Sequence, residues 1–178
     1  MLVMSASAQN GETRSPPAAE MHAAVLRAMV VLKLAPYLVV DPPPAVRKEY
    51  RIGVVGSDIV ATALLKELPG KKVGELPVVV VAIDPADASK DTPAHSCDLL
   101  WVGQSVDRAA EKRIVAVHAT QPVVMVSGRP GFAALGGSVQ LFVQDNGIKF
   151  EVNVDTLKPK GIRANPNLLK LSRKGPTE

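Results

Sequence analysis

Four consecutive valines occupy positions 78–81, in the middle of an apolar run from Leu76 to Ile83. β-Branched residues in so short and unbroken a run predict a β-strand that is covered on both faces, as strands of parallel sheets are. Parallel strands must be joined by crossover connections, which are usually helices. The run therefore favours folds in which strands and helices alternate.

The rest of the chain shows this alternation. Short apolar runs predict further strands at 50–55, 99–102 and 123–127. Apolar residues at helical spacing predict helices at 21–34, 59–68 and 106–117, one helical turn at 132–135 and a last helical stretch after residue 155. Ser57, Ser105 and Asp155 are the predicted N-caps of three of these helices.

The pattern changes near the C-terminus, where two alternating runs at 139–143 and 148–154 flank Asp145, Asn146 and Gly147. Asn-Gly accepts the positive φ angles of a tight primed turn, so these runs predict an antiparallel hairpin. The predicted fold class is α/β. We expect a mixed sheet of mostly parallel strands with right-handed crossover helices, extended by the C-terminal antiparallel β-hairpin.

The length of 178 residues and a hydrophobic fraction of 47% fit one packed domain, which we predict at residues 20–172. Residues 10–19 are polar and contain prolines, and we expect residues 1–19 to form a disordered leader. Within it, Ala-Ser-Ala at 6–8 has the form that a signal peptidase cleaves after, so the leader is either the remnant of an export signal or a chance match. Residues 173–178 are expected to be a flexible tail. No stretch approaches the roughly 20 apolar residues of a membrane-spanning helix.

The net charge of +4 is concentrated in one place. Between Thr156 and Thr177 the chain has no acidic residue and six basic ones: Lys158, Lys160, Arg163, Lys170, Arg173 and Lys174. This patch either attracts an anionic ligand or an acidic partner, or it is a solvated tail. Aromatic residues make up only 3% of the chain, so we expect no nucleic-acid surface built on stacked rings.

The single cysteine, Cys97, is the first candidate for chemistry. With His95 or His118 it suggests a nucleophilic thiol, but it precedes an apolar strand and lacks a nucleophile elbow, which favours a buried thiol. The histidines have no helical spacing typical of a metal site, and no paired carboxylates stand out. We therefore predict no catalytic residue, no metal and no cofactor.

A second candidate is Gly53-x-x-Gly56, followed by Ser57 and a helix. It lacks the third glycine of the dinucleotide fingerprint, so it is weak evidence for a dinucleotide site. The helix start at Ser57 offers free N–H groups to an anion. Composition and spacing alone indicate an α/β domain and are compatible with a binding module.

Several individually weak motifs follow one another in a distinctive order between residues 22 and 174. They read IGVVGS at 52–57, CDLLWVG at 97–103, VMVS at 124–127, GFAALGG at 131–137, IKFEVNVD at 148–155, KGIR at 160–163 and LLKL at 168–171. In this order and spacing the chain resembles the YfiR-like family of periplasmic regulatory proteins.

The resemblance implies a periplasmic, non-enzymatic and generally dimeric regulator. Such a protein binds the periplasmic sensor region of an inner-membrane diguanylate cyclase and represses it, which lowers cyclic-di-GMP and biofilm formation. Small ligands near the C-terminal arginine of the family make Arg163 and Asn165 the matching ligand-binding candidates, beside Ser57. The alternative is a small-anion sensor that acts through a histidine kinase or another receptor.

One position departs from the family pattern. Members often carry a cysteine on the first strand that pairs with the one matching Cys97, and here that position is Gly53. Cys97 therefore has no partner within the subunit. Either the core alone stabilises the fold or Cys97 pairs between molecules, and we expect no thiol–disulfide switch within one subunit.

Overall fold

The computed structural model describes residues 17–41, 47–90 and 96–177. Its main strands are β2 (Tyr50–Val55), β3 (Lys72–Val73), β4 (Leu76–Ile83), β5 (Leu99–Val102), β6 (Val124–Ser127), β7 (Val139–Gln144) and β8 (Gly147–Val152). They form one sheet in the order β3-β4-β2-β5-β6-β7-β8. The predicted α/β fold with a mixed, mostly parallel sheet is confirmed.

The strand directions follow a simple rule. The five inner strands β4, β2, β5, β6 and β7 are parallel, whereas the edge strands β3 and β8 are antiparallel to their neighbours. From β2 the chain moves outward to β4 and then returns to β5 on the other side of β2. The strand order therefore reverses between the carboxyl ends of β2 and β5, and connections that diverge there leave a crevice.

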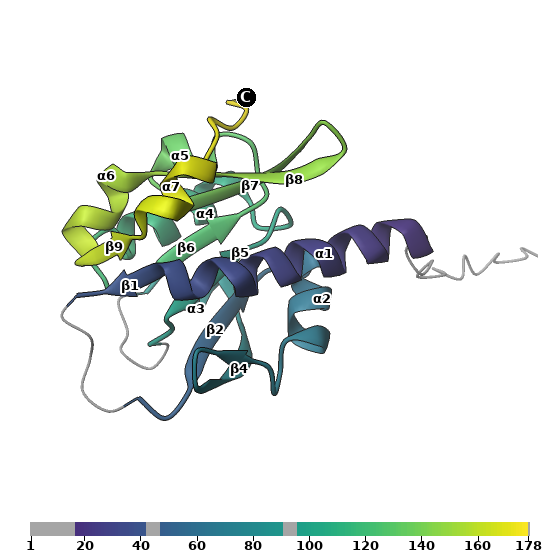
Figure 1. The fold of residues 1–178 in the computed structure, drawn as a ribbon, viewed down its shortest axis with the longest axis horizontal. Helices are drawn as coiled ribbons and strands as arrows, with labels where there is room; N and C mark the ends of the chain where they lie inside the picture. Colours follow the sequence, from purple (N-terminus) through teal and green to yellow (C-terminus); the bar gives the residue numbers. More distant parts are fainter. Residues whose placement is uncertain (1–16, 42–46, 91–95, 178) are drawn as a thin grey trace, which may run out of the picture.

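Helices cover both faces of the sheet (Figure 1). They are α1 (Ala18–Leu34), α2 (Ile59–Glu67), α3 (Pro85–Ala88), α4 (Arg108–Val117), α5 (Phe132–Leu135), α6 (Val154–Leu157) and α7 (Pro166–Leu171). Strand β5 shows why two layers are needed: Leu99 and Trp101 pack with α1 and α2, whereas Leu100 and Val102 pack with α4. Successive strand residues point to opposite faces, so a wholly apolar strand must be covered twice.

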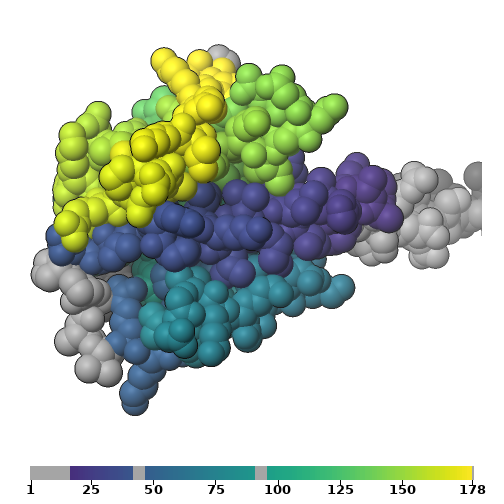
Figure 2. Space-filling view, viewed as in Figure 1, coloured from purple at the N-terminus to yellow at the C-terminus, as the bar shows by residue number. Residues whose placement is uncertain are grey.

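The surface view shows that α1 lies between two parts of the molecule (Figure 2). The C-terminal third, green to yellow, packs along one side of α1, and the region of α2 and β4, blue to teal, packs along the other. The buried side of the helix consists of Ala24, Ala28, Val31 and Leu34. These small and branched residues allow α1 to lie close to the sheet and to α2 at once.

The valine-rich strand β4 is less covered than its sequence predicts. Val78 and Ile83 are buried, but Val79, Val80 and Val81 are only half-buried. Full coverage falls instead on β5 and β6 at the centre of the sheet. Strand β4 has only the two-residue β3 outside it, so its outer part lacks covering neighbours.

Two helix starts differ from the prediction. Asp58, not Ser57, is the N-cap of α2, because its Oδ1 accepts the Ala61 N–H at 2.7 Å. Asp107, not Ser105, caps α4 in the same way. The two serines pair with each other instead, since the Ser57 N–H donates to Ser105 Oγ at 2.8 Å.

The predicted C-terminal hairpin is confirmed, with a correction to its turn. Asp145 and Asn146 have φ angles of 50° and 55°, and Gln144 pairs with Gly147 across the ladder. The two turn residues are therefore Asp145 and Asn146, one position earlier than the predicted Asn-Gly. Asp and Asn tolerate the left-handed region better than other non-glycine residues, which makes this register accessible.

A small antiparallel ribbon, absent from the sequence prediction, links the two ends of the domain. It consists of β1 (Leu38–Val40) and β9 (Ile162–Ala164), and the short 3₁₀ helices η1 (Ala35–Tyr37) and η3 (Lys158–Lys160) precede these strands. Just before β9, α6 is capped by Asn153 rather than by the predicted Asp155, which lies in the first turn. The ribbon brings residues about 120 positions apart in the sequence side by side.

The segment 173–177, expected to be a flexible tail, makes hydrogen bonds along the edge of the sheet. The Arg173 N–H donates to the Phe150 carbonyl at 2.9 Å, and the Gly175 N–H donates to Glu151 Oε2 at 2.7 Å. The Pro176 carbonyl accepts the Gly131 N–H at 3.0 Å. These bonds occupy part of the β8 edge, which is otherwise open to another strand.

Candidate binding cleft

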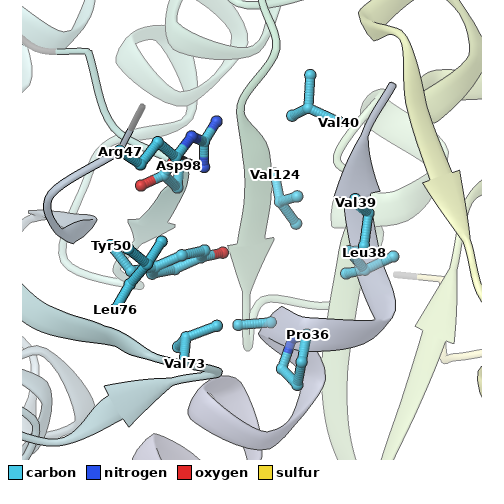
Figure 3. Close-up of a pocket in the computed structure, with 11 residues that line it drawn as sticks. Pro36, Leu38, Val39, Val40, Arg47, Tyr50, Val73, Leu76, Asp98 and Val124 are labelled. Carbon is cyan, nitrogen blue, oxygen red and sulfur yellow. Dashed lines mark ion pairs between the residues drawn. The ribbon is translucent and has the colours of Figure 1, made fainter. Parts of the chain in front are cut away.

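A cleft of about 430 Å³ lies at the amino ends of the parallel strands (Figure 3). One wall is the η1–β1 segment, and the other carries the first residues of β2 and β6. The lining residues are Ala35, Pro36, Leu38, Val39, Val40, Arg47, Tyr50, Val73, Leu76, Asp98 and Val124. A mostly apolar cavity of this size with a few polar groups is typical of a small-molecule site.

The charged part of the cleft is an ion pair between Arg47 and Asp98. Asp98 Oδ2 also accepts the Arg51 N–H at 2.8 Å. Burial raises the pKa of the Asp98 carboxyl, and the Arg51 N–H and the Arg47 charge offset only part of this effect. Both side chains are more than two-thirds buried, so the Arg47–Asp98 ion pair places two charged groups among the mostly apolar residues that line the cleft.

Tyr50, the first residue of β2, supplies the third polar group. Its ring extends from the β2 side into the cleft, and the residue is only 6% exposed. Burial, helped by the nearby Asp98 charge, raises the pKa of the phenol well above its ordinary value. The hydroxyl therefore stays protonated at neutral pH and is able to donate a hydrogen bond to a ligand.

Cys97 faces a second hollow of about 340 Å³, which shares the same ion pair with the cleft. Burial raises the pKa of the thiol to about 11, although the Arg51 charge works in the other direction. At neutral pH the thiol is protonated and is a poor nucleophile. The Nδ1 atom of His118 lies 2.9 Å from a carbonyl of its own helix, and His95 lies outside the described residues.

Gly53 lies directly opposite this thiol. A Cβ atom added at Gly53 would lie 2.9 Å from Cys97 Sγ, 2.7 Å from Ile83 Cδ1 and 2.8 Å from Leu100 Cδ1. The position that the resemblance assigns to a partner cysteine is therefore within bonding reach of Cys97. Since Cys97 is the only cysteine of the chain, no disulfide forms within one subunit.

The two predicted ligand residues Arg163 and Asn165 lie on the outer side of the cleft wall. Arg163 faces Val39 across the β1–β9 ribbon, and its Nε is 3.0 Å from Asp41 Oδ2. Its side chain is 75% exposed. Asn165 caps α7, and its N–H donates to the Tyr37 carbonyl at 2.8 Å. The structure brings these two residues together but includes neither among the residues that line the cleft.

The third predicted residue, Ser57, lies at the other end of the molecule. It follows the carboxyl end of β2, whereas Arg163 belongs to the ribbon beside the amino ends. The Ser57 N–H is also engaged by Ser105 Oγ. Ser57 and Arg163 therefore do not contact the same small ligand in this structure.

The cleft residues Arg47, Tyr50 and Asp98 had no assigned role in the sequence. Asp98 belongs to the CDLLWVG motif and precedes a predicted strand, and Tyr50 begins another predicted strand. The sequence therefore predicts that both residues lie at the starts of strands. Their meeting depends on parallel pairing of β2 with β5, which places Ile52 opposite Leu99. Strand pairing of this kind is not readable from local pattern.

Fold and cleft together define a class of protein: a small α/β binding domain. In the described residues no three His, Cys, Asp or Glu side chains gather as metal ligands would. None of the helices in the described ranges is both long and apolar enough to cross a bilayer.

Comparison with known protein families agrees with this class. Residues 24–173 match the YfiR/HmsC-like family, and the chain belongs to that family. The resemblance predicted from the motifs is thereby confirmed. The family is one of periplasmic regulatory proteins without catalytic activity, connected with diguanylate cyclase signalling.

Proposed function

We propose that this protein is a periplasmic regulator that binds the periplasmic sensor region of an inner-membrane diguanylate cyclase and represses it. Cyclic-di-GMP then falls without any reaction catalysed by the chain itself. The observation that carries the proposal is the family match over 24–173, which covers almost the whole described domain. The protonated thiol of Cys97 agrees with a binding role.

The partner surface that we propose is the mouth of the cleft, on the η1–β1 segment. Two large apolar side chains are exposed there, Tyr37 at 44% and Val39 at 48%. Exposed aromatic and branched residues beside a cavity are typical anchors of protein interfaces. The neighbouring Arg163 and Asp41 supply a polar rim.

Deletion of the gene followed by complementation tests this proposal in cells. Deletion should raise cellular cyclic-di-GMP, and the wild-type gene should restore the low level. Val39→Asp should fail to restore it, because a charge at the interface core is costly to desolvate. Leu171→Asp is the matched control, since Leu171 is 64% exposed on α7 and lies outside the cleft. Unchanged cyclic-di-GMP after deletion, with the cyclase intact, would refute the proposal.

A second candidate is a small-anion sensor that signals through a histidine kinase or another receptor. The exposed guanidinium of Arg163, next to Asn165, favours it because a charge-assisted hydrogen bond to a carboxylate or phosphate is available there. Thermal-shift measurements with nucleotides and amino acids test it. An Arg163→Ala protein that keeps every ligand-induced shift would exclude this candidate.

The family resemblance also leads us to propose a homodimer. Sedimentation equilibrium under reducing and oxidising conditions separates a packed dimer from one joined through Cys97. A dimer that persists in reducing agent supports non-covalent association. A species that is monomeric in reducing agent supports a bridge between Cys97 residues.

A further inference from the structure

The candidate cleft contains one hydrogen-bond donor that the protein itself does not use. Tyr50 is only 6% exposed, and its hydroxyl points into the cleft (Figure 3). In the described part of the chain this hydroxyl makes no hydrogen bond. The hydroxyl of a buried tyrosine usually has a partner, and an exception calls for an explanation.

The Tyr50 hydroxyl is also within reach of a molecule in the cleft. Side-chain atoms that are both fully enclosed and unpaired occur elsewhere in the described ranges, at Trp101 Nε1, Glu111 Oε1 and Arg129 Nε. The Tyr50 hydroxyl is not among them although it too lacks a hydrogen bond, so its oxygen is open to the cleft that Tyr50 lines. A hydrogen-bond acceptor on a bound molecule would therefore supply the missing partner.

The charged groups of the cleft balance each other. The lining residues that carry a charge are Arg47 and Asp98, and they form an ion pair with each other. Asp98 Oδ2 also accepts the Arg51 N–H at 2.8 Å. A charged ligand would have to leave water without an uncompensated counter-charge to receive it, which is costly. The cleft therefore favours a neutral ligand.

The apolar part of the lining comes from two sides of the cleft. Pro36 and Leu38 belong to the η1–β1 segment, whereas Val73, Leu76 and Val124 belong to β3, β4 and β6. Figure 3 shows these two groups of side chains on either side of the cavity. None of the five has a polar group on its side chain, so together they favour a hydrocarbon chain, which leaves water when it lies between them.

We propose that the cleft binds a neutral aliphatic molecule that carries one carbonyl group, such as a medium-chain ketone or ester. The carbonyl oxygen accepts the hydrogen bond of the Tyr50 hydroxyl, and the hydrocarbon chain lies between the η1–β1 segment and Val124. This ligand goes beyond the proposed repression of a cyclase. Its binding is measured on the purified chain, so the outcome is independent of cyclic-di-GMP levels in cells.

Two probes with the same hydrocarbon chain separate the carbonyl from the charge. Methyl pentyl ketone and hexanoate both carry a pentyl group on a carbonyl carbon, and hexanoate has a charged oxygen where the ketone has a methyl group. The full chain is titrated with each probe and followed by its amide chemical shifts. We expect saturable shifts at Val39, Tyr50 and Val124 with the ketone, half-complete at a concentration at least about tenfold lower than with hexanoate. No saturable shift at these residues, or equal affinities for the two probes, overturns the proposal.

The two tyrosines of the chain provide a matched pair of variants. Tyr50→Phe removes the hydroxyl from the cleft and should weaken ketone binding about fivefold, which corresponds to one neutral hydrogen bond. The variant should fold, because that hydroxyl has no protein partner to lose. Tyr37→Phe removes the same group from a residue that is 44% exposed and outside the lining, and it should leave the affinity unchanged. Full ketone affinity in a Tyr50→Phe protein with native circular dichroism, or an equal loss in Tyr37→Phe, refutes the assignment to Tyr50.

Discussion

Replacing Gly53 by cysteine should create a disulfide with Cys97. The Cβ atom at position 53 would lie 2.9 Å from Cys97 Sγ. In a disulfide, an S–S bond of about 2.05 Å places the Cβ of one cysteine about 3 Å from the sulfur of the other. The native backbone is therefore arranged for the bond, and Gly53 has no positive φ angle that a side chain would strain.

The magnitude follows from the loop that the bond would close. Residues 53 to 97 form a loop of about 45 residues, for which the chain-entropy estimate is about 4 kcal/mol. For a domain of this size 1 kcal/mol corresponds to about 2–4 °C, so oxidation should raise Tm by up to about 8–16 °C. Crowding reduces the gain, because Ile83 Cδ1 and Leu100 Cδ1 lie 2.7 and 2.8 Å from the new Cβ. Both are ends of flexible side chains and are able to move.

Thermal and urea unfolding of Gly53→Cys, with and without reducing agent, measures the effect. Gly53→Ala is the matched control for crowding, since it adds the same Cβ without the sulfur. A thiol titration of the denatured protein should find no free thiol in the oxidised variant. Two free thiols, or a bridge found only between molecules, would show that position 53 does not face Cys97 in solution.

Three further predictions concern single side chains. Asp58→Ala removes the acceptor of two backbone N–H groups, so the free energy of unfolding in urea should fall by about 2–3 kcal/mol. The fall should be smaller for Asp107→Ala, because Asp107 caps only its own helix. Equal losses in the two variants would contradict this prediction. Burial raises the pKa of Cys97 from 9.0 to about 11, so the folded state retains a proton that the unfolded state releases. Stability should therefore fall between pH 9 and 11 by on the order of 2 kcal/mol, and Cys97→Ala should lack this fall. Burial lowers the pKa of Lys160 to about 8, so the unfolded state binds more protons above that pH and stability should rise between pH 8 and 9 by up to about 1 kcal/mol. A Lys160→Met protein with the same rise would exclude this cause.

The elements that local pattern predicts well are those with their own turn or periodicity signal. The single turn at Phe132–Leu135 and the strands Tyr50–Val55 and Leu99–Val102 have the predicted bounds. The hairpin is present, although its turn starts at Asp145. The N-cap of α2 was harder to predict, because Ser57 and Asp58 are both good N-cap residues. Contacts between two connections distinguish them in the fold: Asp58 Oδ2 accepts the Gln104 N–H, and the Ser57 N–H donates to Ser105 Oγ.

The candidate sites were less predictable than the elements. Arg163 and Asn165 are neighbours in the sequence and remain neighbours on β9 and α7, but the residues that line the cleft come from distant segments. Arg47 and Asp98 are about 50 positions apart, and they meet because β2 and β5 pair in parallel. Nothing in the local sequence around Tyr50 indicates that its hydroxyl lacks a hydrogen-bond partner and points into the cleft.

The sequence by itself determined the alternation of strands and helices and the hairpin, because each depends on residues within a few tens of positions. It also determined the membership of the YfiR/HmsC-like family, because that depends on the order of motifs along the chain. The tertiary structure alone decided the strand order, the β1–β9 ribbon and the separation of Ser57 from Arg163. Pairing between distant strands is set by the total burial and hydrogen bonding of the whole sheet. Those quantities are properties of the folded chain and have no local counterpart in the order of its residues.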